Sequence, residues 1–212
     1  MAEARHCAWL MLALIAGFAL TLPGSRDPGT WLMEVAPVLA VMPLLWFTRR
    51  RFPLTDLSYS LIGVQALIMM VGGHYTYARV PAGYWVQDAL HLARNDYDKL
   101  GHLAQGWVPA LCAREILLRC TPLRRGGWLF LIVTAICLAI SACYEFVEWW
   151  AALLLGSGAD DFLGSQGDPW DTQSDMFTAL LGAMIGQLLM ARWQDRQLAR
   201  LAPAAGKAAR IV

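Results

Sequence analysis

Hydrophobic residues in this chain are gathered into six long blocks that alternate with shorter polar connections. The blocks cover residues 7–23, 30–48, 56–73, 100–118, 128–152 and 174–193. A helix needs about 20 predominantly apolar residues to cross a bilayer, so each block predicts a transmembrane helix. We therefore expect an all-α fold, an integral membrane bundle of six transmembrane helices that forms a single domain over residues 1–198.

Basic residues in the connections predict the orientation of this bundle. They stand in TRRRF (48–52), in LRCTPLRR (118–125) and in the segment that follows the sixth block. Six crossings bring all three groups to one side, which the positive-inside rule identifies as the cytoplasm. We therefore expect cytoplasmic N- and C-termini, with residues 199–212 as a basic cytoplasmic tail. The 74–98 loop and the acidic 156–173 loop then face outward.

The outward 74–98 loop contains an amphipathic pattern. Trp85, Ala89 and Leu92 recur at helical spacing, while Asp88 and His91 fall on the opposite side. This pattern predicts a helix that lies on the membrane surface. Such a helix could cover a site at the outer face, or it could be a solvated connection between two spans.

The composition agrees with a membrane protein and argues against other classes. Hydrophobic residues make up 58% of the 212 residues and charged residues 16%, against about 45–50% and about 25% in soluble domains. The formal net charge is +1, and no basic run is long enough to indicate nucleic acid. The expected partners are therefore membrane lipids. None of the five cysteines forms a C-x-x-C pair, which favours reduced core residues over a disulfide framework.

Ionisable residues gather at the predicted outer ends of four helices. These residues are Asp98, Lys99 and His102 in the fourth helix, Glu145 and Glu148 in the fifth, Asp171 and Asp175 in the sixth, and His74 at the end of the third. Each such group costs roughly 2.5–3.5 kcal/mol at membrane depth on insertion scales. Three pairs among them have the spacing that places both members on one helix face. We therefore expect one polar site that opens to the outer leaflet.

The residue types at this site permit more than one chemistry. Histidine and carboxylate groups can bind a divalent metal such as zinc, manganese or iron, and the candidate ligands are His102, Glu148, Glu145 and Asp175. The same groups can run general acid/base catalysis or carry protons or substrate. No H-E-x-x-H, E-x-x-H or EF-hand pattern selects among these uses.

Individual roles can be assigned under the catalytic interpretation. His102 and Glu148 are the candidate acid and base, or the ligands of a metal. Asp98 would orient His102, and Lys99 would hold an anionic group such as phosphate. Four further residues are expected to surround the substrate: Glu145, Asp171, Asp175 and His74.

Several of these residues also have a structural interpretation. Thr172 and Asp175 have the spacing of a capping box, and Asp171 could accept hydrogen bonds from free N–H groups at a helix end. Lys99 could pair with a glutamate of the fifth helix and fix the helix register. His74 could simply lie at the membrane interface.

Four segments resemble a known family. They are HYTYARVP (74–81), NDYDKLGHLAQGWVPALCAREILLR (95–119), SACYEFVEWW (141–150) and FLGSQGDPWDTQSDMFTALLGA (162–183). Together they are similar to the uncharacterised bacterial inner-membrane family typified by YjdF, over about residues 10–193. That resemblance implies a six-helix, multi-pass protein of the bacterial inner (plasma) membrane and supplies no established activity.

A weaker likeness runs to VanZ-like membrane proteins, which carry a D-K-x-x-H at a helix start and a later D-x-x-x-N-x-x-G. DKLGH (98–102) matches the first element, whereas DMFTALLG (175–182) departs from the second. VanZ-like proteins are associated with glycopeptide resistance, which by analogy suggests the cell envelope.

Three functions are consistent with this pattern. The first is an outer-leaflet site that binds or acts on a lipid headgroup or a lipid-linked envelope substrate, with a divalent metal as a candidate cofactor. The second is a small transporter or proton-coupled channel, for which Gln105, Gln65, Ser58 and Ser60 are the inward polar residues. The third is a structural or accessory membrane scaffold held by a buried ion-pair network.

Overall fold

The computed structural model describes residues 2–156, 160–163 and 165–205, and these residues form helices joined by loops, with no strand among them. In chain order the helices are α1 (Ala2–Thr21), α2 (Pro28–Thr48), α3 (Asp56–Tyr75), the 3-10 helix η1 (Tyr77–Arg79), α4 (Pro81–Leu90), α5 (Tyr97–Cys120), α6 (Gly127–Leu155), α7 (Asp160–Leu163) and α8 (Asp171–Ala205). The predicted all-α class is confirmed. Part of the acidic 156–173 loop, and the end of the predicted tail with Lys207 and Arg210, lie outside the described residues.

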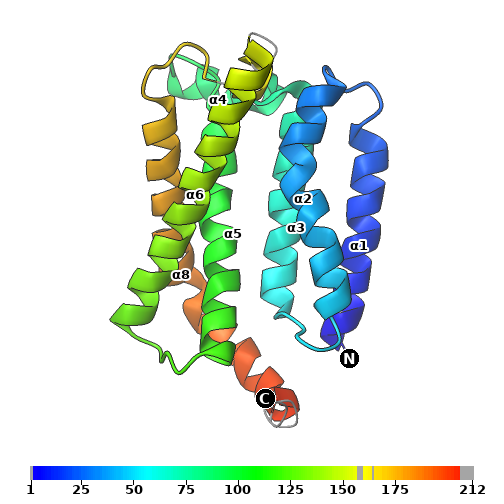
Figure 1. Cartoon of the computed structure of the whole chain (residues 1–212), viewed down its shortest axis with the longest axis vertical. Coiled ribbons are helices and arrows are strands. Elements are labelled where there is room, and N and C mark those ends of the chain that lie inside the picture. The colour runs from blue at the N-terminus through cyan, green and yellow to red at the C-terminus, as the bar shows by residue number, and fades with distance from the viewer. Residues whose placement is uncertain (1, 157–159, 164, 206–212) are drawn as a thin grey trace.

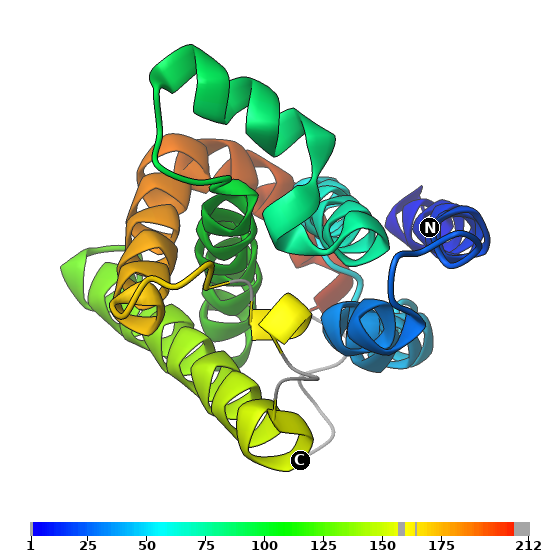
Figure 2. The same ribbon diagram turned by 90° about the horizontal axis from the view of Figure 1, so that it is seen from above.

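The long helices stand side by side in two groups (Figure 1). Helices α1, α2 and α3 pack on one another in the first group, and α5, α6 and α8 form the second. Contacts between α3 and α5 join the groups, and α7 contacts both α2 and α6. Figure 2 shows α7 over the space between the groups. The start of α1 and the end of α8 lie opposite α4; the α4 end is called the upper end below, as it is drawn in Figure 1.

Four helices are long and apolar enough to cross a membrane: α2, α3, α6 and the Asp171–Leu201 part of α8. Large apolar side chains such as Leu44, Leu154 and Leu188 are exposed on the outside of the bundle, where lipid would cover them. The apolar part of α1, Arg5–Thr21, is shorter, and polar residues lower the hydropathy of α5. Four of the six predicted spans therefore meet the length and composition that a membrane crossing requires.

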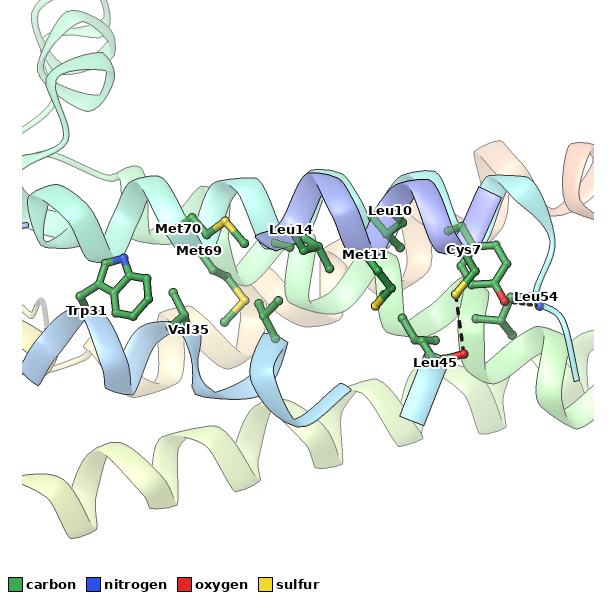
Figure 3. Close-up of a cluster of buried hydrophobic side chains, with 13 residues drawn as sticks. Cys7, Leu10, Met11, Leu14, Trp31, Val35, Leu45, Leu54, Met69 and Met70 are labelled. Carbon is green, nitrogen blue, oxygen red and sulfur yellow. Dashed lines mark hydrogen bonds between the residues drawn. The ribbon is translucent and has the colours of Figure 1, made fainter. Parts of the chain in front are cut away.

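Apolar side chains form a core in each helix group. In the first, Met11 and Leu14 of α1 pack with Val35 of α2 and Met70 of α3 (Figure 3). In the second, Leu111 of α5 packs in a cluster with residues of α6 and α8. The second cluster also includes Leu57 of α3, so it links the two groups.

The closest helix pair is α5 and α8, which meet through small residues. A methyl group added to Gly106 would overlap the carbonyl group of Ala179, and one added to Gly182 would overlap the carbonyl group of Leu103. The G-x-x-x-G pattern that ends at Gly186 thus serves close packing, as its spacing predicts. This contact fixes Lys99 and His102 of α5 against the start of α8.

A buried polar network closes the lower end between α3 and α5. Glu115 is fully buried, and its carboxylate accepts hydrogen bonds from the hydroxyl groups of Thr55 and Ser58 at 2.9 Å. Arg119 donates to the same carboxylate at 2.7 Å. Because its polar atoms are satisfied by protein partners, this network has a structural explanation.

The predicted amphipathic helix is present but shorter than the 74–98 loop. Helix α4 ends at Leu90, since His91 adopts the left-handed conformation with φ 53° and terminates the helix. Trp85 and Leu90 are exposed on it. Two roles were open for this helix, a cover of a site and a connection between spans; none of the residues that line the cavity described below comes from α4, which favours the connection.

Asp27 caps the start of α2 and provides a test of local stability. Its carboxylate accepts hydrogen bonds from the Gly29 N–H and the Thr30 hydroxyl, both at 2.9 Å, and these bonds hold the pKa of Asp27 below its ordinary value. We expect Asp27→Ala to lower the free energy of unfolding by about 1 kcal/mol, measured by thermal unfolding in detergent. Asp27→Asn should retain most of this stability at neutral pH.

The pH dependence of the Asp27 contribution has a definite sign. A carboxylate whose pKa is lowered by folding stabilises the folded state above its unfolded pKa and loses that effect as the pH falls through the folded value. The wild type should therefore lose its advantage over Asp27→Asn below about pH 4. If the difference in free energy of unfolding between the wild type and Asp27→Asn did not change with pH, the capping role of the Asp27 carboxylate would be contradicted.

Candidate functional site

His102 is the centre of the candidate site, near the upper end of α5. Its side chain is 5% exposed. The Nε2 atom lies 3.4 Å from Oδ1 of Asp98, one turn earlier in α5, and 3.7 Å from Oδ1 of Asp175 in α8. The structure therefore brings three of the predicted site residues together, through the helical spacing of the first pair and the close contact of the two helices.

The other ring nitrogen of His102 has its own partner. Nδ1 lies 2.8 Å from Oε1 of Gln105. An amide oxygen can only accept a hydrogen bond, so in this arrangement Nδ1 carries a proton and donates it. In the neutral ring, Nε2 then presents its lone pair towards the carboxylates. Histidines that bind metals or transfer protons are commonly oriented in this way.

Lys99 pairs with α8 rather than with the glutamates of α6. Its Nζ lies 2.5 Å from Asp175 Oδ1, 2.7 Å from Ser174 Oγ and 3.1 Å from Asp171 Oδ1. An ammonium group has three N–H donors, and each of these finds a protein acceptor. This arrangement leaves Lys99 no free donor for the phosphate that the sequence suggested.

Glu145 and Glu148 approach His102 from α6. One ligand atom from each of these three residues lies within 4.8 Å of the other two, and the same holds for His102 with Asp98 and Asp175. Glu145 is 6% exposed, and its Oε1 has no hydrogen-bond partner among the described residues. The predicted convergence of α5, α6 and α8 on one polar cluster is therefore present.

Two predicted residues lie at the edge of the cluster or away from it. Asp171 accepts hydrogen bonds from Lys99 and, at 2.7 Å, from Arg94, so it joins α8 to the segment before α5. Burial alone would lower the pKa of Arg94, but the hydrogen bond and charge of Asp171 outweigh it and raise that pKa. His74 lies apart, with Nδ1 2.7 Å from the carbonyl oxygen of Thr21. His74 is thus not a member of the site.

Four further residues complete the site and were not identified from the sequence. Glu34 of α2 is 4% exposed and accepts a hydrogen bond at 3.4 Å from the hydroxyl group of Tyr144. Tyr77 of η1 and Phe162 of α7 are also buried, and both line the cavity that is described next. Glu34 could have been found, because it is the single ionisable residue of its apolar block. The aromatic residues carry no comparable signal.

One cavity of about 580 Å³ connects this polar cluster to the middle of the bundle. Glu34, Asp98, His102 and Glu148 line its upper end, and Phe162 lies beside them. The rest of its wall is mainly apolar and comes from α2, α3, α5 and α6. The cavity is thus polar at its upper end and apolar along the rest of its length.

The cavity opens sideways between α2 and α6. Its lining includes Val41 and Leu44 of α2 and Ile140 of α6, which are 38%, 61% and 41% exposed. Ile116 of α5 lines it near the lower end and is 46% exposed. A molecule in the surrounding bilayer could therefore enter without passing through water.

The polar residues proposed for an inward path are only partly in the cavity. Gln65 and Gln105 line its wall. Ser58 instead contributes to the Glu115 network, and the hydroxyl group of Ser60 lies 3.5 Å from Nε2 of His6 on an exposed part of the bundle. Two of the four residues proposed for an inward path therefore lie outside the cavity.

Comparison with known proteins places the chain in a family. The profile described as "Predicted membrane protein (DUF2238)" matches residues 6–196. The chain is 59% identical to Inner membrane protein YjdF of Escherichia coli (strain K12) over 176 residues, which cover 83% of this chain and 84% of that protein. No solved structure matches the chain. The chain is therefore a multi-pass inner-membrane protein that belongs to the DUF2238 family of YjdF-like membrane proteins.

Proposed function

We propose that this protein binds, or acts on, the headgroup of a lipid or lipid-linked envelope substrate at a site centred on His102. The observation that carries the proposal is the shape and chemistry of the cavity. Its upper end presents a histidine and carboxylates, its long remainder is mainly apolar, and it opens between α2 and α6. An amphiphile has the same division between a polar head and an apolar chain.

The proposal includes six membrane crossings with cytoplasmic termini. The α1 and α5 helices stand in the same bundle as the four candidate spans (Figure 1). The start of α1 and the end of α8 lie at the lower end of the bundle, as an even number of crossings requires. The basic residues of the α2–α3 and α5–α6 connections favour a cytoplasmic lower end. The upper cluster then faces the outer leaflet.

The length of the cavity favours a long lipid chain. Asp98 and Ile116 of α5 both line it, and at about 1.5 Å rise per residue these positions are about 27 Å apart. The hydrocarbon core of a bilayer is about 30 Å thick, so the cavity runs deeper than one leaflet. A polyisoprenoid chain can occupy that full length, whereas an ordinary acyl chain is shorter than the cavity.

The charge at the upper end limits the kind of headgroup. Glu34, Asp98 and Glu148 line the cavity with His102 as the one basic side chain, while Lys99 is committed to Asp171 and Asp175. The site therefore suits a headgroup that is cationic or is bound through a cation. His102 and Glu148 are the groups placed to exchange protons with it.

Photolabelling can test the lipid assignment. We expect a photoreactive polyisoprenyl phosphate, supplied in nanodiscs together with a divalent cation, to label residues of α2, α5 and α6, and a palmitoyl phospholipid under the same conditions to label them less. Ala113→Phe should reduce that labelling because Ala113 lines the lower part of the cavity, where only a long chain reaches. Leu131→Phe is the matched control, since Leu131 is 55% exposed on α6 and is not part of the lining.

The thermal midpoint of Ala113→Phe must stay near that of the wild type for the comparison to be valid. If a folded Ala113→Phe protein were labelled like the wild type, the cavity would not be the site of the lipid chain. Equal labelling by both lipids would contradict the preference for a long polyisoprenoid chain, but not the cavity as the site of the lipid chain.

A further inference from the structure

We infer that a metal site adjoins the upper end of the cavity, in which His102, Glu145 and Glu148 bind one divalent transition-metal ion. This inference deepens the proposed function, because the ion would lie where the lipid headgroup is expected. It rests on side chains of α5 and α6 and makes no use of the apolar part of the cavity. Binding of the ion and labelling by the lipid chain are measured separately, so failure of one proposal can be distinguished from failure of the other.

The first support is the distance among candidate ligand atoms. One atom each from His102, Glu145 and Glu148 lies within 4.8 Å of the others. Metal–ligand bonds to imidazole nitrogen and carboxylate oxygen are about 2.0–2.2 Å long, so one ion between these atoms needs only small side-chain movements. Helical spacing puts both glutamates on one face of α6, so they converge on the ion together.

The second support is an unpartnered buried atom. Oε1 of Glu145 is buried and has no hydrogen-bond partner in the described part of the chain. Buried carboxylate oxygens are nearly always satisfied, and leaving one unsatisfied costs about 1–3 kcal/mol or more. A cation at this position would satisfy the atom that the protein itself does not.

The third support is the state of His102. Its Nδ1 donates to Gln105 at 2.8 Å, which is the hydrogen bond that a metal-binding histidine typically makes through its other nitrogen. Nε2 is thereby left to bind the ion. Gln105 is a positioning residue in this arrangement, because it acts through His102 rather than on the ion.

A second set of three ligands is less suitable. Asp98 and Asp175 also lie near His102, but Asp175 is already paired with Lys99 at 2.5 Å. An ion bound to Asp175 would have to lie close to that ammonium group, and the like charges would repel. The two glutamates have no lysine or arginine within 4.0 Å among the described residues, which favours the α6 ligands.

The ligand types indicate the class of ion. One imidazole nitrogen with two carboxylates suits zinc, manganese or iron(II), whereas calcium and magnesium prefer oxygen ligands alone. The carboxylates neutralise the charge of a divalent ion. Such an ion could in turn bind an anionic headgroup, which neither Lys99 nor the carboxylates could do alone.

Metal binding can be measured without an activity assay. The test titrates detergent-solubilised, metal-free protein with Zn²⁺ by calorimetry and records bound zinc by mass spectrometry. We expect one zinc ion per chain, and a rise in the thermal midpoint on binding. Glu145→Gln and His102→Gln should each weaken the affinity by roughly 10–100-fold or more.

The control variant is His91→Gln, which removes an exposed histidine outside the site. It should bind zinc like the wild type. Absence of stoichiometric zinc in the folded wild type would overturn the inference, as would unchanged affinity in both site variants. Zinc binding without polyisoprenoid labelling would instead overturn the proposed lipid function, and labelling without zinc would overturn only the metal site.

Should Glu145→Gln or His102→Gln fail to fold, Gln105→Leu provides the alternative measurement. It removes the hydrogen bond to Nδ1 while keeping all three ligands. We expect this variant to bind zinc more weakly, since the orientation of the ring is lost, and Gln105→Glu to restore binding because it keeps an acceptor. Equal affinity in Gln105→Leu and the wild type would count against His102 as a ligand.

Discussion

Lys99→Met is expected to lower the free energy of unfolding by about 3–5 kcal/mol. Asp175 is 1% exposed and its closest cationic partner is Lys99 at 2.5 Å. Removing the ammonium group leaves the buried carboxylate with no lysine or arginine partner within 4.0 Å among the described residues; the ring of His102, at 3.7 Å, is its remaining neighbour. An uncompensated buried charge is among the most destabilising changes that one substitution can make. Thermal unfolding in detergent measures the effect.

A second substitution should reverse much of this loss. In Lys99→Met/Asp175→Asn the carboxylate is replaced by a neutral amide of the same shape, so no charge is left unpaired. The double variant should be more stable than Lys99→Met alone. Arg51→Met, on an exposed loop residue, is the control for loss of a cation. The single variant Asp175→Asn completes the comparison. If the double variant lost as much free energy of unfolding as the sum of the losses in Lys99→Met and Asp175→Asn, the two residues would not be coupled.

Gly106→Ala is expected to lower the free energy of unfolding by about 1–3 kcal/mol or more, which is large for one added methyl group. Its new Cβ would overlap the backbone carbonyl of Ala179 in α8, and a backbone cannot move aside as a flexible side chain can. The helices would have to separate along a contact that also includes Gly182 and Gly186. The thermal midpoint should fall, and zinc affinity should fall with it because a displaced α5 carries His102 away from its position relative to the glutamates of α6.

Gly127→Ala separates the steric effect from the loss of a glycine. Gly127 begins α6, and a Cβ at this position meets no atom within 4 Å. Alanine favours a helix more than glycine does, by about 1 kcal/mol, so this variant should be as stable as the wild type or slightly more so. A Gly106→Ala protein with the same midpoint as Gly127→Ala would show that α5 and α8 tolerate separation.

The sequence predicts the helical class and the gathering of polar residues because both depend on periodicity and chain direction. Apolar blocks give helices, and alternating directions bring the start of α5, the end of α6 and the start of α8 to one end. Periodicity does not say which side of a helix faces which neighbour. For this reason Lys99 was expected to meet Glu145 or Glu148, whereas the close contact of Gly106 with α8 turns it towards Asp171 and Asp175.

Other parts of the site lie beyond what pattern can predict. Phe162 and Tyr77 enter the cavity from short segments whose position depends on tertiary packing. Helix α4 was expected to be a candidate cover because it is amphipathic, but an exposed amphipathic face does not determine what a helix lies above. Glu34 differs from these residues because the sequence does point to it. A single acidic residue within an apolar block indicates a functional position.

The sideways opening between α2 and α6 has a consequence for how binding strength should be expressed. A ligand that arrives through this opening comes from the bilayer, so its effective concentration is its mole fraction among the lipids and not its amount per volume of water. Dilution of the sample in buffer would leave occupancy unchanged, whereas addition of other lipids would lower it. Two membranes with equal totals of the ligand but different areas would then occupy the site to different extents.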